Sequence, residues 1–273
     1  MPDFKTSIVL FTPKKSLSQR FLINSEIARR EASFAKGKRA IEIGPGYGIL
    51  TNELAKVAKS VIAVELDHTL FLFLKSSIAN KNVTLINKDF LKTSANELEL
   101  ETAEIIVANV PYSISSKVIA FVAEHRLEAV LCMQKEFVER MLARAGTSEY
   151  SRLSAMSQLS FSMEKVMEVG RRNFSPVPKV DSCVIHLSSK GTTIDPKEKE
   201  IIGELMIHKR KTVRSAILCS STYFKMKKEE LRQLAENLVE KDTRVFQMNP
   251  QELVQLARKI STWSSRDPAP ARV

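Results

Sequence analysis

The chain has 273 residues, of which 44% are hydrophobic and 27% are charged, a composition typical of a globular protein. This composition excludes a disordered or collagen-like protein, and the longest apolar runs, such as residues 105–108, are too short for a transmembrane helix. The cysteines and histidines are scattered without metal-ligand spacing, so we expect no metal site and a reducing compartment. The first residues lack the pattern of a signal peptide, and we expect a cytoplasmic protein without a membrane partner.

Basic residues outnumber acidic ones by 42 to 31, which gives a formal net charge of +11. Such an excess favours a polyanionic partner, because neutralised phosphates release their counterions. The alternative is a basic protein with no such partner. Residues 205–228 contain seven basic residues and no acidic one, whereas a solvated helix face usually alternates the two signs. We therefore predict a phosphate-binding surface formed by Lys209, Arg210, Lys211, Arg214, Lys225, Lys227 and Lys228.

Apolar runs of strand length alternate with helical patterns through the first two thirds of the chain. Strands are expected at 39–43, 60–66, 83–89, 104–110 and 128–134, with helices at 49–58, 67–79, 115–125, 135–145 and 152–161. This alternation predicts a parallel, doubly wound α/β sheet. Two further strands, at 163–169 and 182–187, have no helix between them, so an antiparallel edge is expected.

The polar segment 190–199 contains glycine and proline and is typical of a linker. Beyond it only helical patterns occur, at 197–207, 209–219, 227–240 and 249–260. We therefore expect an α/β domain over 1–188, a small all-helical basic domain over 189–263, and a disordered tail over 264–273.

A glycine-rich turn, Gly-Pro-Gly-Tyr-Gly at 44–48, directly follows the first of these strands. Glycines allow the backbone to approach a ligand closely, and Glu65 at the end of the next strand could bind ribose hydroxyls. Asp89 beside Phe90 suits the amino group and the face of an adenine. NAD and S-adenosylmethionine (SAM) both fit this pattern. The spacing and Pro45, which supplies no N–H for a phosphate, favour SAM.

Asn109, Val110, Pro111 and Tyr112 follow the fourth strand, at the edge where parallel sheets bind ligands. Methylating an exocyclic amine requires acceptors that hold its hydrogens, so that the lone pair points at the methyl group. The Asn109 side-chain oxygen and the Val110 carbonyl can be those acceptors, and Tyr112 offers a face on which a base can stack. The alternative is a turn that only caps the following helix.

The segment 174–182 carries two prolines two residues apart and is expected to be stiff and extended. Phe174 could clamp the other face of a base taken out of its stack, and Arg171, Arg172 and Lys179 could hold phosphates. The alternative is a rigid hairpin loop with a phenylalanine in the core.

The chain resembles the KsgA-type ribosomal RNA adenine dimethyltransferases. The matching runs lie in family order at 18–22, 41–46, 63–67, 89–91, 109–116 and 174–182. The resemblance implies a Rossmann-like class I SAM-dependent methyltransferase sheet followed by a small helical domain. It also implies SAM-dependent N6,N6-dimethylation of two adjacent adenosines near the 3′ end of small-subunit rRNA during ribosome biogenesis. We expect a monomer.

By position, the resemblance implies a cofactor set of Gln19, Arg20, Leu22, Gly44, Gly46, Glu65, Leu66, Asp89, Phe90 and Asn109. It implies a catalytic set of Asn109, Val110, Pro111, Tyr112 and Phe174. Arg20 stands where the family usually has Asn or His, and its guanidinium could instead meet an RNA phosphate. The alternatives are a large-subunit rRNA adenine methyltransferase of the antibiotic-resistance type and a non-catalytic assembly factor of the same fold.

Overall fold

The computed structural model describes residues 19–226, 228–238 and 242–264, with the side chains of 228, 237, 238 and 264 left out. The chain divides into two compact units, which are described separately. The first comprises the chain up to Val138 together with Phe161–Ser189, and the second comprises Glu139–Ser160 and the chain from Lys190 onwards. This grouping places Glu139–Ser160 with the C-terminal helices, whereas the sequence assigns these residues to the α/β domain. The boundaries expected at 188 and 263 stay a prediction.

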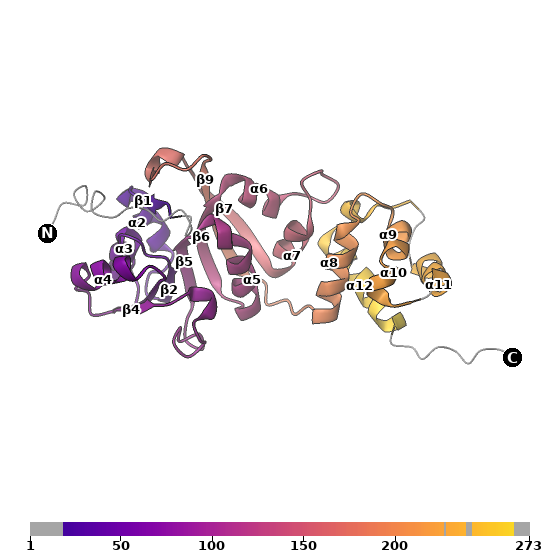
Figure 1. The fold of residues 1–273 in the computed structure, drawn as a ribbon, viewed down its shortest axis with the longest axis horizontal. Helices are drawn as coiled ribbons and strands as arrows, with labels where there is room; N and C mark the ends of the chain where they lie inside the picture. Colours follow the sequence, from indigo (N-terminus) through magenta and orange to yellow (C-terminus); the bar gives the residue numbers. More distant parts are fainter. Residues whose placement is uncertain (1–18, 227, 239–241, 265–273) are drawn as a thin grey trace. The chain divides into compact units, whose positions relative to one another are not determined.

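The first unit contains a seven-stranded sheet of order β4-β3-β2-β5-β6-β9-β7 (Figure 1). Its parallel strands are β2 (Arg39–Ile43), β3 (Ser60–Glu65), β4 (Val83–Asn87), β5 (Ile105–Asn109) and β6 (Glu128–Gln134). At one edge, β9 (Ser182–Ser189) pairs antiparallel with both β6 and β7 (Phe161–Val169). The predicted α/β sheet with an antiparallel edge is confirmed.

The central strands are rich in β-branched residues and are buried on both faces, as expected where helices cover a parallel sheet. The helices of this unit are α2 (Ser25–Ser33), α3 (Ile49–Val57), α4 (His68–Ser77) and α5 (Ser115–His125), and α6 (Lys135–Leu142) begins in it. Short 3₁₀ turns follow β4 at Phe90–Lys92 and β5 at Tyr112–Ile114, with a third at Arg171–Asn173. The sequence pattern did not predict α2. Its Asn24 cap accepts N–H groups from Glu26 and Ile27, and its alanines face the core.

A separate two-stranded sheet joins distant parts of the first unit. In it β1 (Phe21–Leu22) pairs antiparallel with β8 (Phe174–Ser175), so that Leu22 lies opposite Phe174. The Ile23 N–H donates to the Asn173 carbonyl at 2.8 Å and extends this pairing. The segment at 19–22 and the segment at 174–182 are thereby brought to the same place in the fold.

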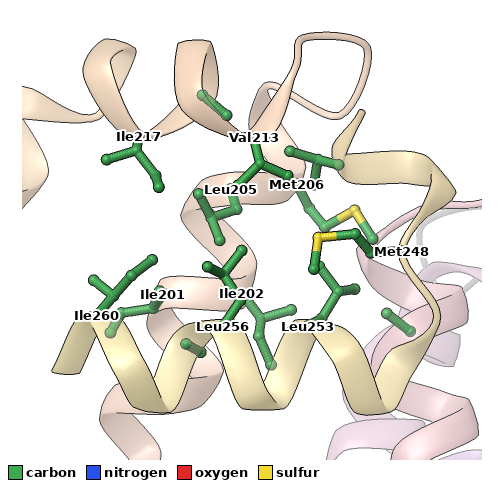
Figure 2. Packing of buried hydrophobic residues seen from close by; sticks show 14 of the residues in the cluster. Ile201, Ile202, Leu205, Met206, Val213, Ile217, Met248, Leu253, Leu256 and Ile260 are labelled. Atoms are coloured by element: carbon green, nitrogen blue, oxygen red, sulfur yellow. The ribbon is translucent and has the colours of Figure 1, made fainter. Parts of the chain in front are cut away.

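The second unit is helical among its described residues. Its helices are α7 (Arg152–Ser160), α8 (Pro196–Ile207), α9 (Val213–Cys219), α10 (Ser221–Phe224), α11 (Lys228–Leu238) and α12 (Pro250–Ser264), and a 3₁₀ turn lies at Val245–Gln247. Figure 2 shows α8 and α12 presenting their apolar side chains to each other, with Ile201, Ile202 and Leu205 on one side and Leu253, Leu256 and Ile260 on the other. All six are buried, so this pair of helices forms the centre of the unit.

Several helix boundaries differ from the sequence prediction, and α6, for example, ends at Leu142 where the pattern extends to 145. The helix predicted from 209 begins at Val213, because Thr212 caps it and residues 208–211 form a turn, in which the Lys211 N–H donates to the His208 carbonyl at 2.8 Å. The last helix extends to Ser264, which was expected to begin the tail. The rest of the expected tail, residues 265–273, lies outside the described residues. In the part of the chain that is described, no helix has the length and apolarity needed to cross a bilayer.

Candidate active site

A cavity of about 270 Å³ opens at the carboxyl ends of β2, β3, β4 and β5. This is the edge at which parallel α/β sheets bind ligands, and the volume lies just below the range of about 300–1,000 Å³ for ligand pockets. The predicted residues that line the cavity are Gln19, Arg20, Gly44, Gly46, Glu65, Leu66, Asp89, Phe90, Asn109, Val110, Pro111, Tyr112 and Phe174. Leu22 does not line it, and its side chain is buried in the core of the first unit. Phe174 belongs to the same core and also reaches the cavity.

The glycine loop between β2 and α3 forms the floor of the cavity. Gly46 has a φ of +58°, and a Cβ placed there would lie 2.7 Å from Cδ1 of Phe21. A side chain at this position would therefore be strained and would collide with the ring of Phe21. Glycine is required here for close approach as well as for the turn.

Glu65 ends β3 and is held by the glycine loop itself. Its Oε2 accepts the Gly46 N–H at 3.1 Å, and its Oε1 accepts the Asp67 N–H at 2.8 Å. Burial raises the pKa of this carboxyl above its usual value, and the two N–H donors oppose that shift. A carboxylate has about four acceptor positions, so two bound N–H groups leave capacity for ligand hydroxyls. Beside it, Leu66 is 51% exposed and offers an apolar surface to a ligand.

Asp89 and Phe90 lie after β4, at the next strand end. Asp89 Oδ1 caps the following 3₁₀ turn by accepting the Leu91 N–H at 3.0 Å. The buried Phe90 ring meets Phe121 edge to face, with ring centroids 4.8 Å apart. This contact fixes the Phe90 ring in the cavity wall.

Asn109 and Val110 are fixed by the neighbouring strand and by α2. The Val110 N–H donates to the Cys132 carbonyl on β6 at 3.0 Å, and the Asn109 Nδ2 donates to Oε2 of Glu31 at 3.1 Å. The other end of the same carboxamide, Oδ1, is buried and has no hydrogen-bond partner among the described residues. An unsatisfied buried acceptor on a residue that lines a cavity can accept a hydrogen bond from a ligand or from water.

Tyr112 is held by a hydrogen bond to β9, a strand of the antiparallel edge of the sheet. Its hydroxyl lies 2.9 Å from Oγ of Ser182 at the start of β9, and burial raises the pKa of the phenol. Phe174, also in the cavity wall, is only 4% exposed because β8 pairs with β1. Both aromatic residues predicted to contact a base are therefore at the same cavity.

Gln19 and Arg20, which precede β1, also line the cavity. Gln19 donates through Nε2 to Asp67 Oδ2 at 3.1 Å. Arg20 is exposed, and its guanidinium donates to the Gln19 carbonyl at 3.0 Å. Its charge acts on the Tyr112 phenol, lowering that pKa in opposition to burial. Arg20 and Tyr112 both line the cavity.

Sequence reasoning missed several residues of this site. Cys132, Ser182 and Lys117 line the cavity, and Glu31 contacts Asn109 from outside it. Ser182 begins β9, and Cys132 lies opposite Asn109 in β6. A sequence-derived sheet order could have used both positions as a signal. Glu31 gave no such signal, because the helix that carries it was not predicted.

A family model described as ribosomal RNA adenine dimethylase matches residues 10–261. The chain belongs to the ribosomal RNA adenine dimethylase family. Among similar proteins, one from Thermococcus gammatolerans, named as a probable ribosomal RNA small subunit methyltransferase A, is 37% identical over 89% of this chain and 88% of its own length. One from Bacillus cytotoxicus, named as ribosomal RNA small subunit methyltransferase A, is 38% identical over 82% of both chains.

Solved structures of related enzymes agree with the fold of this dimethylase family member. A dimethyladenosine transferase from Plasmodium falciparum is 29% identical, with a TM-score of 0.76 over 89% of this chain and 98% of that one. The 23S rRNA methyltransferase ErmE is 25% identical, with a TM-score of 0.61 over 88% of this chain and 99% of that one. The expected family, Rossmann-like fold and methyltransferase class are confirmed.

Basic residues of the first unit of this dimethylase stand near the end of β7. Arg171, Arg172 and Lys179 are exposed, and the Arg171 guanidinium donates to the Lys179 carbonyl at 3.4 Å. The Asp181 carboxylate accepts the Arg171 backbone N–H at 2.9 Å. The loop thus holds its cations outward beside the segment that carries Phe174.

The predicted basic surface of the second unit contains residues with different partners. Lys209 donates to the carbonyls of Ser148 and Tyr150 at 2.8 and 2.7 Å, and Arg214 pairs with Glu236 at 2.8 Å. Lys225 is exposed, Lys227 lies outside the described residues, and of Lys228 only the backbone is described. The first two cations are therefore engaged within the protein.

Arg210 and Lys211 instead line an open groove of about 490 Å³ together with Arg244. Its other lining residues are Thr212, Ser215, Leu218 and Cys219, so no acidic side chain is among them. Lys211 Nζ lies 2.9 Å from Cys219 Sγ. Arg244 was missed because α11 separates it in sequence from the basic segment at 205–228. Over the described ranges, no cluster of three His, Cys, Asp or Glu side chains could hold a metal ion.

Proposed function

We propose that this protein transfers methyl groups from SAM to N6 of two adjacent adenosines near the 3′ end of small-subunit rRNA. It acts on each adenosine twice, as a cytoplasmic monomer, during assembly of the subunit. Relatives that are 37% and 38% identical carry the name of small-subunit rRNA methyltransferases, and the chain covers more than four fifths of each. The observation that carries the proposal is the unsatisfied Asn109 Oδ1 in the wall of a cavity that also contains the glycine loop and Glu65.

The residues present fit SAM. Glu65 would accept the ribose hydroxyls, Asp89 the adenine amino group, and the backbone of Gly44 and Gly46 would allow the close approach that a side chain would block. Gln19, Leu66 and Phe90 would complete this half of the cavity. SAM, when bound, supplies a methyl group activated by its sulfonium.

The other half of the cavity would position the target amine. Asn109 Oδ1 and the Val110 carbonyl would accept its hydrogens, while Tyr112 and Phe174 would contact the faces of the extruded base. No strong base is required, because the amine proton becomes acidic as the new bond forms. Catalysis is then mainly the alignment of the two bound reactants, which can lower the activation free energy by roughly 7–11 kcal/mol.

Two basic regions would bind rRNA phosphates, each on its own unit. On the first unit these are Arg171, Arg172 and Lys179, together with Arg20 at the cavity. On the second unit Arg210, Lys211 and Arg244 form the groove, which offers three cations to a polyanion without an acidic lining residue. Arg214 contributes less, because its charge is paired with that of Glu236. The side chains of Lys209, Lys211 and Arg244 bond uncharged groups of the protein, so their charges remain unpaired by these contacts.

The test is transfer of labelled methyl from SAM to small ribosomal subunits taken from cells that lack the modification. Large subunits and a short naked RNA serve as controls, and the labelled positions are mapped. Two adjacent dimethyladenosines in the small subunit are expected. Labelling of large subunits would instead support the antibiotic-resistance type, and SAM binding without any transfer would indicate an assembly factor.

A further inference from the structure

The side chain of Glu31 is a buried acid that reaches the catalytic loop from behind. It lies on α2, is 1% exposed, and accepts a hydrogen bond from Asn109 Nδ2 across 78 residues of sequence. It does not line the cavity, so it cannot contact a ligand there directly. Glu31 can therefore affect the cavity through its hydrogen bond with Asn109.

Among the described residues, no basic side chain is paired with Glu31 or lowers its pKa, so no cation explains why an acid is buried there. The adjacent basic residues of α2 point elsewhere: Arg30 donates to the Val166 carbonyl, and Arg29 pairs with Glu53 at 3.6 Å. The titratable groups that interact with Glu31 are Glu42 on β2 and Cys132 on β6, and both are buried. Burial raises the pKa of Glu31 to about 8, so the neutral acid predominates at pH 7. A neutral carboxyl still offers its carbonyl oxygen as an acceptor.

The hydrogen bond decides which end of Asn109 the cavity receives. A carboxamide has an NH₂ end and an oxygen end of nearly equal size, and only its partners distinguish them. Since Glu31 takes the NH₂ end, Oδ1 is left without a partner among the described residues. The reverse orientation would present donors to an amine whose hydrogens are also donors.

We propose that Glu31 is a positioning residue for methyl transfer, which holds the Asn109 carboxamide with Oδ1 available to accept the hydrogens of the target amine. The inference rests on the proposed function for its catalytic consequence, but the orientation of Asn109 is a property of the protein itself. It predicts that the acceptor at position 31, and not the negative charge, is what the site needs.

Two variants separate these contributions. Glu31→Gln keeps the shape and a carbonyl acceptor, whereas Glu31→Met keeps the length and removes the acceptor. We expect Glu31→Met to lower kcat at least tenfold, with an unchanged Kd for SAM. The Tm should be unchanged or higher, because Oε1 of the buried carboxyl has no hydrogen-bond partner among the described residues and is costly to the fold. Glu31→Gln should restore most of kcat. Glu53→Gln is the matched control, because Glu53 is a buried acid of α3 that does not line the cavity, and it should leave kcat unchanged.

A double-mutant cycle with Asn109→Ala shows whether Glu31 acts through Asn109. In the Asn109→Ala background, Glu31→Met should cost little more, because the group that it positions is gone. An undiminished tenfold loss there, or equal losses in Glu31→Gln and Glu31→Met, would overturn the proposal.

A readout independent of catalysis completes the test. The side-chain NH₂ protons of Asn109, followed by ¹⁵N-resolved hydrogen exchange, should be protected in the wild type and in Glu31→Gln but not in Glu31→Met. Equal exchange in all three would refute the inference even if the enzyme were active. Protection as expected in a protein that transfers no methyl group would refute the proposed function and leave the orientation of Asn109 established.

Discussion

The buried Glu31 makes the free energy of unfolding depend on pH, and Glu31→Gln should remove its contribution. The contribution of Glu42, whose pKa is also raised to about 8 by burial, should remain in the variant. The pKa of Glu31 is raised from 4.5 to about 8 by burial. Between these values the unfolded chain releases a proton that the folded protein keeps, so the stability of the wild type falls as pH rises. Below pH 4.5 the group is protonated in both states and contributes no difference.

The magnitude follows from the size of the shift. One pKa unit corresponds to about 1.4 kcal/mol, so the stability of Glu31→Gln relative to the wild type should grow by about this amount per pH unit. At pH 8 the difference should be on the order of 4 kcal/mol, a large part of a typical total of about 5–15 kcal/mol.

Urea unfolding of both proteins at intervals from pH 5 to pH 9, followed by far-UV circular dichroism, measures this difference. Glu26→Gln is the matched control, because Glu26 lies on the same helix and is exposed. A Glu31→Gln difference that stays constant between pH 5 and 8, or one matched by Glu26→Gln, would refute the reasoning.

Four further outcomes follow from the geometry. Asn109→Ala should lower kcat about 100-fold with the fold intact, as measured by methyl transfer and circular dichroism, and near-normal turnover would contradict its role as an acceptor. Gly46→Ala should weaken SAM binding in calorimetry, because the new Cβ meets Phe21 and a left-handed φ costs about 1–2 kcal/mol. Ser182→Ala should reduce kcat less than Tyr112→Ala, since it removes the partner of the hydroxyl but leaves the ring. Charge reversal at Arg210, Lys211 and Arg244 should weaken binding to small subunits and flatten its salt dependence. Charge reversal at Arg214, which is paired with Glu236, should have a smaller effect on both. Equal effects would show that the groove has no special role in binding.

The sequence predicted those site residues whose position depends only on the end of a single strand. Gly44, Glu65, Asp89 and Asn109 each follow a short apolar run, and parallel pairing brings all such ends to one edge. The antiparallel edge could be predicted for the same local reason, because two strands without a helix between them cannot form a parallel pair.

What could not be predicted depends on long-range contacts. The helix at Ser25–Ser33 is mostly polar, and its buried acid is explained only by an asparagine 78 residues further along the chain. The late start of α9 depends on the Thr212–Arg244 bridge, which no local pattern contains. Leu22 was assigned to the cofactor set by resemblance alone, and its side chain is buried in the core and does not line the cavity. A motif position therefore does not specify which way its side chain points.

The two-residue pairing of β1 with β8 has a consequence for shortened forms of the protein. A chain trimmed to begin at α2 would keep the whole glycine loop, Glu65, Asp89 and residues 109–112. It would nevertheless leave β8 without its partner and expose the buried Phe174, and it would remove the Phe21 ring that packs on Tyr47. Such a fragment would retain most of its signature residues while lacking one wall of the cavity, so an inventory of motifs would overestimate what it can bind.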